Sequence, residues 1–281
     1  KVACEAWSKP LTSEMPHMAY SVSKSFLSTA YGFALDEGKI TRETRFVDIF
    51  PEFKNKKDKY LEKLTIHQLL CMTAGKQTAI RGSKSDDWLK VFVKAKWIFE
   101  PGTSWRYVND NYYIASKMLC KILGESISDY LTPRLFEPLG IEGASWQESP
   151  QGINTGGWGL YLKTEDLAKM GQLILQGGKW NGKQLISSEW IAEATAKHID
   201  CRPAGWRPEQ INFKAEDSDW LQGYCYQMWR CRHGAVRADG ANGQYIIVMP
   251  EQNAVIAMTA NISDMQGEIN LVWEHLLPAL Q

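Results

Sequence analysis

The amino-acid sequence predicts an α+β fold, in which an antiparallel sheet is flanked by helices and an all-helical domain is inserted into the chain between the parts that form the sheet. Three observations predict it: a short extended segment opens the chain, helical patterns fill its middle, and alternating strands with a last helix close it. We therefore expect a discontinuous α/β sheet domain over residues 1–18 and 200–281, and a mostly helical domain over residues 19–199.

The first helix is expected over Ser21 to Asp36. Its apolar residues, among them Phe26, Ala30 and Phe33, recur on one helical face, which is typical of a helix packed against a core. Gly38 follows the pattern, and glycine at this position commonly ends a helix.

The following residues, up to 199, carry further helical patterns that Pro and Gly interrupt. Thr164 has the side chain of a good N-cap, and Gly177-Gly178 is expected to end the helix that Thr164 begins. The helical stretches expected here are 64–70, 109–123, 126–136, 164–176 and 188–198.

The last part of the chain changes to strands. The segments 223–230, 243–249 and 253–259 read as strands, and a Pro-Glu-Gln turn separates the last two. A final helix is expected from Ser263 to Leu277, directly before Pro278.

The composition is that of a globular protein without a charge preference. A chain of 281 residues can bury a sizeable core, and a hydrophobic content of 44% is ordinary. Lys plus Arg and Asp plus Glu both number 32, so we expect neither a nucleic acid nor an anionic membrane surface as partner. No run approaches the roughly 18 apolar residues of a membrane span. Nothing in the composition indicates an oligomeric state.

The cysteines and histidines predict neither disulfides nor a metal site. Six cysteines are widely spaced without a C-x-x-C pair, so we expect free thiols in a reducing compartment, with Cys71 and Cys120 in the core. The five histidines show no metal-binding spacing, and no cofactor is expected. The cytoplasm is the expected location. The abrupt N-terminus suggests missing residues, which leaves a periplasmic or extracellular location open.

The segment Ser21-Val-Ser-Lys24 places a hydroxyl and an amine three residues apart at the start of the first helix. Side chains at this spacing lie on one helical face. A serine hydroxyl is a poor nucleophile until a base takes its proton, and a lysine whose pKa is tuned by its surroundings can assist. The helix N-terminus also favours developing negative charge. By itself the motif fits equally a Ser N-cap followed by a surface Lys.

A second candidate segment is Tyr107-Val-Asn109, just before a predicted helix. Beside an ammonium group a tyrosine can ionise and act as a base, and Asn109 can bind both the lysine and a substrate amide. A core tyrosine with Asn109 as N-cap is the alternative. Trp105, Trp158 and Trp229 lie near the motif segments and fit either a substrate cleft or ordinary packing.

The third segment runs from Arg237 to Pro250, where a Gly-rich turn leads into a strand. Glycines such as Gly240 let a backbone approach a ligand closely, and an exposed strand N–H can stabilise an oxyanion. An ordinary hairpin turn is the alternative for this segment taken alone.

Together, the order and spacing of the three segments resemble the serine β-lactamase and penicillin-binding protein family. The resemblance is strongest to its class C β-lactamase and esterase branch, where Tyr-x-Asn is the middle motif. The turn Gly240-Ala-Asn-Gly-Gln244 is most similar to nylon-oligomer (aminohexanoate-dimer) hydrolases and related esterases. The resemblance covers nearly the whole chain and includes the segments 64–70, 72–75, 99–103, 156–160 and 164–168.

The resemblance implies a β-lactamase/transpeptidase-like fold with the active site at the interface of the two domains. It implies that Ser21 forms an acyl-enzyme, that Lys24 and Tyr107 share the general base and acid duties, and that Asn109 orients the substrate or the lysine. The backbone N–H groups of Ser21 and Ala241, beside Gly240, would form the oxyanion hole. The order in which Lys24 and Tyr107 accept the proton stays open, because two interacting groups titrate as one unit.

One departure from the family pattern bears on the substrate. Where the wider family has Lys or His followed by Thr or Ser, this chain has Ala238 and Asp239. The cation that would meet a substrate carboxylate is absent, and Asp239 would repel one. Arg237 is expected on the opposite strand face from Ala238.

Three hypotheses follow. The favoured one is a serine hydrolase of small-molecule or peptide-like esters or amides. The second is a D,D-peptidase or β-lactamase, and the third a catalytically silent ligand-binding relative. The absent cation before Asp239 disfavours the second, and the combination of Ser21, Lys24 and Tyr107 disfavours the third.

Overall fold

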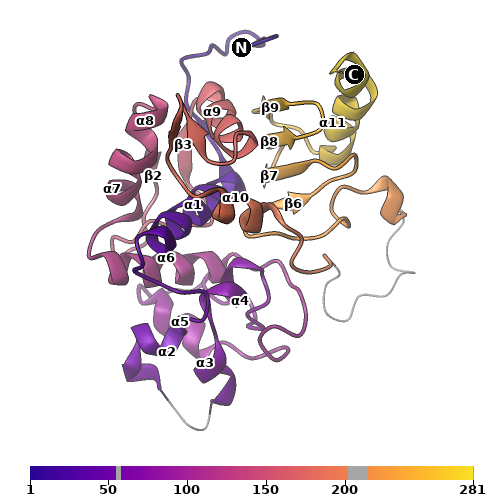
Figure 1. Ribbon diagram of the computed structural model, residues 1–281. Coiled ribbons are helices and arrows are strands. Elements are labelled where there is room, and N and C mark those ends of the chain that lie inside the picture. Colours follow the sequence, from indigo (N-terminus) through magenta and orange to yellow (C-terminus); the bar gives the residue numbers. More distant parts are fainter. Residues whose placement is uncertain (55–57, 202–213, 281) are drawn as a thin grey trace.

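The structure is a computed structural model that describes residues 1–54, 58–201 and 214–280 (Figure 1). A four-stranded antiparallel sheet lies on one side of the molecule, and helices make up most of the other side. The α+β class predicted from the sequence is therefore confirmed.

The four-stranded sheet has the order β6-β7-β8-β9, and each strand pairs with the next along the chain. Its strands are β6 (Trp229–Arg230), β7 (Val236–Gly240), β8 (Gln244–Met249) and β9 (Ala254–Met258). The strand expected over 223–230 is shorter than predicted. Gln227 has a left-handed φ of 69°, and the Cys225 N–H bonds to the Met228 carbonyl, so a tight turn interrupts the extended segment before β6.

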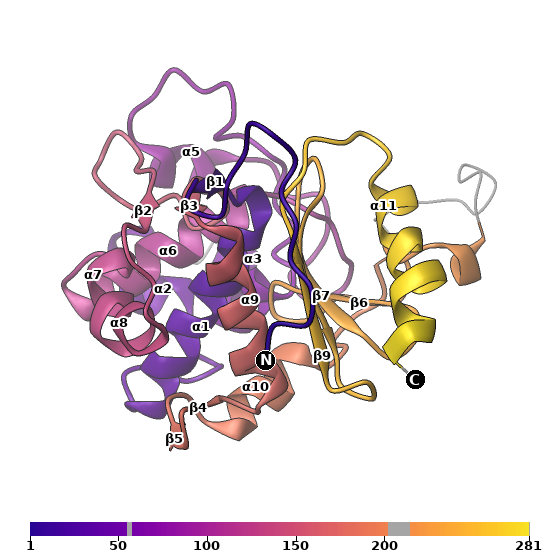
Figure 2. The same ribbon diagram turned by 90° about the horizontal axis from the view of Figure 1, so that it is seen from above.

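The sheet separates two hydrophobic clusters because successive strand residues point to opposite faces. Tyr245 and Ile247 of β8 face the C-terminal helical segment, which consists of α11 (Met265–Leu271) and the turns that continue it to Leu280. Ile246 and Val248 face the large core shared with the helices. Figure 2 shows the resulting layers, with α11 on one side of the sheet and α9 (Thr164–Leu175), α1 (Ser23–Asp36) and α10 (Ser188–Thr195) on the other.

The first helix is the centre of the helical region. The predicted segment from Ser21 divides into a 3₁₀ turn, η1 (Tyr20–Val22), and α1 (Ser23–Asp36). All residues of α1 from Ser23 to Ala34 are buried, so the helix is enclosed on every side rather than on one face.

The remaining helices surround α1 or lie below it in Figure 1. The stretch predicted over 126–136 is α7 followed by a wider helical turn over Thr132–Phe136, where Pro133 lacks the N–H for a regular helical bond. The helices are α2 (Phe46–Ile49), α3 (Lys59–Lys63), α4 (Ile66–Leu70), α5 (Trp88–Lys94), α6 (Asp110–Leu123), α7 (Ile127–Leu131), α8 (Glu137–Leu139), α9 (Thr164–Leu175) and α10 (Ser188–Thr195).

Two parts of the chain lie elsewhere than the sequence suggested. The strand near the N-terminus, β1 (His17–Met18), pairs with β3 (Leu160–Leu162), which also pairs with β2 (Ser145–Trp146), and not with the C-terminal strands. Helix α9, assigned to the helical domain, packs on β8 and β9; Gly171 permits this approach, because a Cβ there would lie 2.5 Å from Val255. The division at residues 18 and 199 therefore stays a prediction, with α9 attached to the sheet.

The N-terminus of α9 is capped differently from the prediction. Thr164 is the first helical residue rather than the N-cap, and its hydroxyl bonds to that of Thr259 at 2.7 Å. The Asp166 carboxylate instead accepts the backbone N–H of Lys163 at 3.2 Å.

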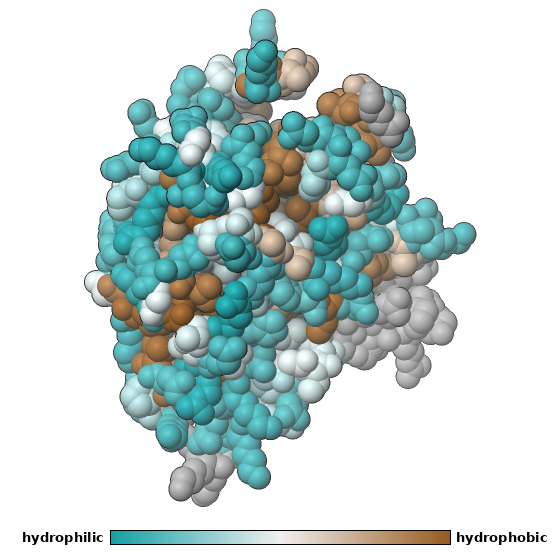
Figure 3. Space-filling model, in the orientation of Figure 1, coloured by the Kyte–Doolittle hydropathy of each residue, from teal (hydrophilic) through white to brown (hydrophobic). Residues whose placement is uncertain are grey.

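All six cysteines are free thiols in the structure, and the predicted burial of Cys71 and Cys120 is confirmed. Among the described residues, none of the helices has the length and apolarity needed to cross a membrane. The face shown in Figure 3 is mainly hydrophilic, with scattered apolar patches.

Candidate active site

Ser21 lies in the 3₁₀ turn η1 rather than in α1 itself. The residue before it, Tyr20, has a φ of 45°, a left-handed conformation that is uncommon for a bulky residue and strained. Ser23 holds this turn: its hydroxyl donates to the Tyr20 carbonyl at 2.6 Å and accepts the Leu160 N–H at 3.2 Å. The side chain of Ser21 stays partly exposed at the start of a buried helix.

Lys24 lies one turn further along, as the S-x-x-K spacing predicted. Its ammonium is 2.7 Å from the Ser21 hydroxyl and 2.6 Å from the Gly157 carbonyl oxygen. The side chain is only 1% exposed. The alternative interpretation, a surface lysine, is therefore wrong.

Two aromatic rings enclose the Lys24 amine. Its Nζ is 5.1 Å from the ring centroid of Tyr107 and 4.9 Å from that of Tyr112. Burial lowers the pKa of Lys24 well below its usual value, and the nearby charge of Asp239 opposes this only in part. The environment favours the neutral amine, which can accept a proton from Ser21.

Tyr107 is half-buried in an aromatic cluster. Its ring stacks on Trp229 with centroids 5.7 Å apart, and Trp105 packs edge-on against Trp229 at 5.5 Å. Burial raises the pKa of Tyr107, while a hydrogen bond to Ser21 opposes the rise. This direction disfavours the ionised tyrosine considered from the sequence. Of the three tryptophans that lie near the motif segments in the sequence, Trp158 packs against Trp88 and not in this cluster.

Asn109 comes directly before α6, but its side chain does not cap the helix. Its Oδ1 is buried and has no hydrogen-bond partner among the described residues. The Lys24 amine bonds to Gly157 and Ser21 rather than to this oxygen. Of the two roles implied for Asn109, the geometry leaves that of an acceptor for a substrate N–H.

The Gly-rich turn lies beside the nucleophile turn. A Cβ on Gly240 would lie 2.5 Å from the carbonyl oxygen of Ala19, so only glycine permits β7 to pack this closely on η1. Ala241 follows directly. The two backbone segments predicted to supply the oxyanion N–H groups, those of Ser21 and Ala241, are therefore neighbours.

Charged residues on β7 follow the predicted alternation. Ala238 pairs with Ile246 on one face, whereas Arg237 and Asp239 pair with Ile247 and Tyr245 on the other. Arg237 is fully buried and forms an ion pair with Asp239, its Nε 2.9 Å from the carboxylate. The face that carries Ala238 has no cation on this strand, and the Asp239 charge is largely neutralised by Arg237.

Sequence reasoning missed the roles of Tyr112 and Gly157. Gly157 belongs to a segment that resembles the family, but nothing in its residue type indicates that its carbonyl accepts a bond from Lys24. Tyr112 lies within the helix expected over 109–123 and was given no role of its own. Its hydroxyl bonds to that of Tyr224 at 2.6 Å, which ties α6 to the segment before β6.

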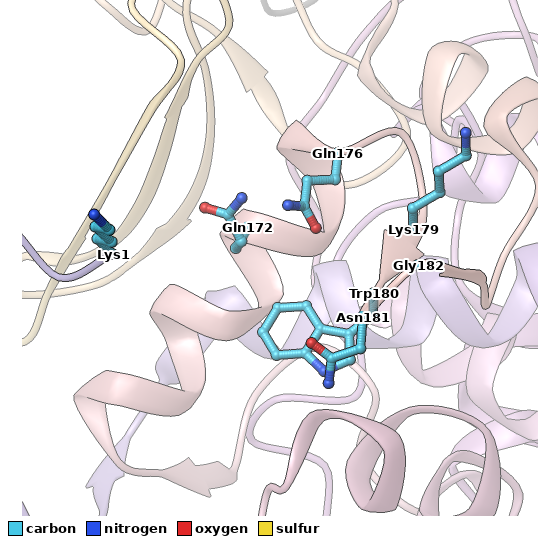
Figure 4. Close-up of a pocket in the computed structure, with 7 residues that line it drawn as sticks. All are labelled: Lys1, Gln172, Gln176, Lys179, Trp180, Asn181 and Gly182. Carbon is cyan, nitrogen blue, oxygen red and sulfur yellow. The ribbon is translucent and has the colours of Figure 1, made fainter.

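One surface hollow lies away from this site. It lies between Lys1, α9 and the hairpin of β4 (Lys179–Trp180) and β5 (Lys183–Gln184), as Figure 4 shows. It contains none of the predicted site residues.

A serine, a buried lysine and a tyrosine joined in this way beside an antiparallel sheet define a serine hydrolase of the β-lactamase/transpeptidase-like fold. Comparison with known proteins gives the family. The Beta-lactamase family model matches residues 1–278, and the chain belongs to that family.

Individual relatives are distant. A 6-aminohexanoate-dimer hydrolase of Paenarthrobacter ureafaciens is 22% identical over 88% of this chain and 67% of its own length. A β-lactamase of Escherichia coli is 22% identical over 97% of this chain and 82% of its own length. Penicillin-binding protein 4 of Amycolatopsis lactamdurans is 28% identical, and the matched region covers 47% of this chain but only 36% of that protein's length.

Solved structures share the fold. A 6-aminohexanoate-dimer hydrolase-like protein of Bacillus anthracis superposes with a TM-score of 0.77 at 20% identity, covering 98% of this chain and 74% of that one. An octameric penicillin-binding protein homologue of Pyrococcus abyssi gives a TM-score of 0.72 at 20% identity, covering 95% and 67%.

Proposed function

We propose that this enzyme cleaves ester or amide bonds of small-molecule or peptide-like substrates that carry no carboxylate beside the scissile bond. The observation that carries the proposal is the 2.7 Å contact between the buried Lys24 amine and the Ser21 hydroxyl. A neutral amine can donate to Gly157 and accept the serine proton at the same time.

In the proposed reaction, the Ser21 oxygen attacks the substrate carbonyl carbon while its proton passes to the Lys24 amine. The N–H groups of Ser21 and Ala241 stabilise the resulting oxyanion. The proton then passes from Lys24, through the Tyr107 hydroxyl, to the leaving oxygen or nitrogen, and the carbonyl–leaving-group bond breaks. Water then attacks the acyl-enzyme carbonyl carbon while its proton passes to the base. The bond to the Ser21 oxygen breaks, the serine regains its proton, and the acid is released.

The preference for substrates without that carboxylate rests on β7. The site-side position holds the methyl group of Ala238, and Arg237 is turned to the other face, where it donates to the Asp239 carboxylate and to the backbone carbonyl of Asp219. A substrate carboxylate at this place would lose its water shell without gaining a cation. This disfavours β-lactams and D-Ala-D-Ala peptides.

The test is hydrolysis of p-nitrophenyl butyrate by the wild type, Ser21→Ala and Lys24→Ala, with nitrocefin in parallel. We expect about a 10³-fold or larger loss of kcat/KM in both variants and little nitrocefin turnover. Ser28→Ala is the matched control, because Ser28 lies on the same helix with a buried hydroxyl that has no partner among the described residues, and it should retain wild-type activity.

The other outcomes decide between the remaining hypotheses. Rapid nitrocefin turnover would show a β-lactamase and remove the argument from Ala238. Ester turnover that persists in Ser21→Ala would show that the nucleophile is misassigned. If neither the ester nor nitrocefin is cleaved, the linear dimer of 6-aminohexanoate tests whether the enzyme cleaves amides. If this dimer is not cleaved either, the result would favour a catalytically silent ligand-binding protein.

A further inference from the structure

Three side chains that can bind a metal meet outside the active site. His67 lies on α4, Cys71 ends that helix, and His198 follows α10. One possible ligand atom from each lies within 4.8 Å of the other two. His67 and Cys71 are four residues apart and so share a helix face, but the sequence gives no sign that His198 joins them.

Hydrogen bonds fix the tautomer of His67. The hydroxyl of Tyr226 has one hydrogen, which it donates to the Glu193 carboxylate at 2.9 Å. The Tyr226 oxygen is 2.6 Å from Nδ1 of His67, so it must accept a hydrogen from that nitrogen. The neutral imidazole of His67 then carries its free lone pair on Nε2.

A second hydrogen bond fixes His198 in the same manner. Its Nε2 lies 2.9 Å from the backbone carbonyl oxygen of Glu193, which can only accept. The hydrogen is therefore on Nε2, and Nδ1 holds the free lone pair. Metal-binding histidines are commonly oriented in this way, with the second ring N–H donated to a carbonyl or to a carboxylate-linked group.

Cys71 completes the set. Its side chain is buried, and its sulfur lies 3.9 Å from both ring nitrogens of His67. Zinc bonds to sulfur and nitrogen at about 2.3 and 2.0 Å, so two such ligands in a tetrahedron lie about 3.5 Å apart. The Cys71 sulfur is equidistant from the two ring nitrogens of His67, so shared binding with the Nε2 lone pair requires the cysteine side chain to turn toward Nε2.

Access and charge also suit a cation. His67 and His198 are partly exposed, so an ion can reach the buried thiol from solvent. Arg42 pairs with the Glu193 carboxylate and neutralises it, so the Cys71 sulfur, which loses its proton when it binds the ion, is the anionic ligand. Two imidazoles and one thiolate select a borderline-soft ion such as Zn²⁺ over Mg²⁺ or Ca²⁺.

We propose that His67, Cys71 and His198 bind one zinc ion, with water in the fourth position. The site revises the expectation of no metal that the scattered histidines gave. Tyr226 belongs to the segment whose Tyr224 and Trp229 pack against Tyr107. The ion would therefore fasten one wall of the active site to α4, as a structural element and not as a participant in ester cleavage.

The test uses the full chain with Cys4→Ser, which removes the exposed thiol. Metal-free protein is titrated with Zn²⁺, and separately with Co²⁺ to record the thiolate-to-cobalt absorption in the near ultraviolet. We expect one ion per chain, the thiolate band, and a zinc-dependent rise in the thermal midpoint. Tyr226→Phe should weaken zinc binding about 10- to 100-fold through the loss of His67 orientation.

Two ligand variants and one control complete the design. Cys71→Ser and His198→Gln should both lose the zinc-dependent rise in the thermal midpoint. Cys71→Ser should also lose the thiolate-to-cobalt band. Cys120→Ser removes a buried thiol elsewhere and should behave as the wild type. The proposal is overturned if the parent protein shows no thiolate-to-cobalt band, or if either ligand variant binds zinc as the parent does. Should both variants fail to fold, the parent spectrum alone decides.

Discussion

Two buried aspartates near the sheet show how differently the same carboxyl group can be used. Asp219 is fully buried and accepts hydrogen bonds from the backbone N–H and guanidinium of Arg232, from Gln266 and from Trp273. Burial alone would raise its pKa, but these donors outweigh burial and hold the pKa of Asp219 below its ordinary value.

Asp239 lies on β7 with fewer donors. Its side chain is 10% exposed, and among the described residues Arg237 is its ion partner. Burial raises the pKa of Asp239, and the charges of Arg237 and Lys24 oppose the rise only in part. The number of hydrogen-bond donors thus distinguishes the two carboxylates. Asp219, with many donors, is a structural anchor, whereas the charge of Asp239, with few, acts on Lys24 and Tyr107.

The largest expected effect is on the stability of Asp219→Ala. Removing the carboxylate leaves the Trp273 N–H without its acceptor and leaves Arg232 and Gln266 only the Asn270 oxygen, which should cost about 3–5 kcal/mol in the free energy of unfolding. Urea unfolding at pH 7 measures it. Asp217→Ala, an exposed neighbour, should change stability by less than about 0.5 kcal/mol.

The wild type and Asp219→Ala should also differ in how their stability changes in acid. Because the folded-state pKa of Asp219 lies below the unfolded value of 3.8, its contribution is complete above that pH and is lost as the pH falls through the folded-state pKa. The stability gap between wild type and Asp219→Ala should therefore narrow in acid. A gap that stays constant down to pH 2 would contradict the assignment.

A smaller effect on stability, with a distinct effect on catalysis, is expected for Asp239→Asn. The amide oxygen still accepts a bond from Arg237, so we expect a loss of about 2 kcal/mol. Since the Asp239 charge raises the pKa of Lys24, its removal should move the acid limb of the kcat/KM profile for p-nitrophenyl butyrate to lower pH. An unmoved limb would show that Asp239 does not act on the base.

Glu268 extends the comparison to a half-buried carboxylate that has few hydrogen-bond donors. Its Oε2 is buried without a partner among the described residues, and burial raises its pKa from 4.5 to about 7. The folded protein binds this proton more tightly than the unfolded chain, so stability falls as the pH rises from 4.5 through 7. Glu268→Gln should gain about 1 kcal/mol at pH 8, allowing for solvent screening, and nothing at pH 4. Thermal unfolding at the two pH values compares the variants, and equal gains at both would refute the cause.

Much of this arrangement could be predicted from local pattern. The S-x-x-K spacing fixed the neighbourhood of Ser21 and Lys24 because both lie within one helical turn. The alternation along β7 correctly separated Arg237 from Ala238. Both inferences concern residues close in sequence, where backbone geometry alone decides which side chains meet.

Contacts across the chain could not be predicted in this way. The carbonyl of Gly157 and the ring of Tyr112 meet Lys24 because α1, α6 and the loop before β3 pack together. The fully buried α1 shows the same limit, since its pattern resembles that of a helix with one apolar face. Asp219 carries no motif at all, because its side-chain donors come from Arg232 and from the C-terminal helical segment, both distant in the sequence.

The contact between Gly240 and the Ala19 carbonyl has a consequence for protein engineering. Any side chain at position 240 would push the strand away from the nucleophile turn, so this position is closed to attempts to change which substrates are accepted. Positions 238 and 241 on either side of it carry only methyl groups. A library that seeks a new substrate range should vary these two and leave the glycine between them untouched.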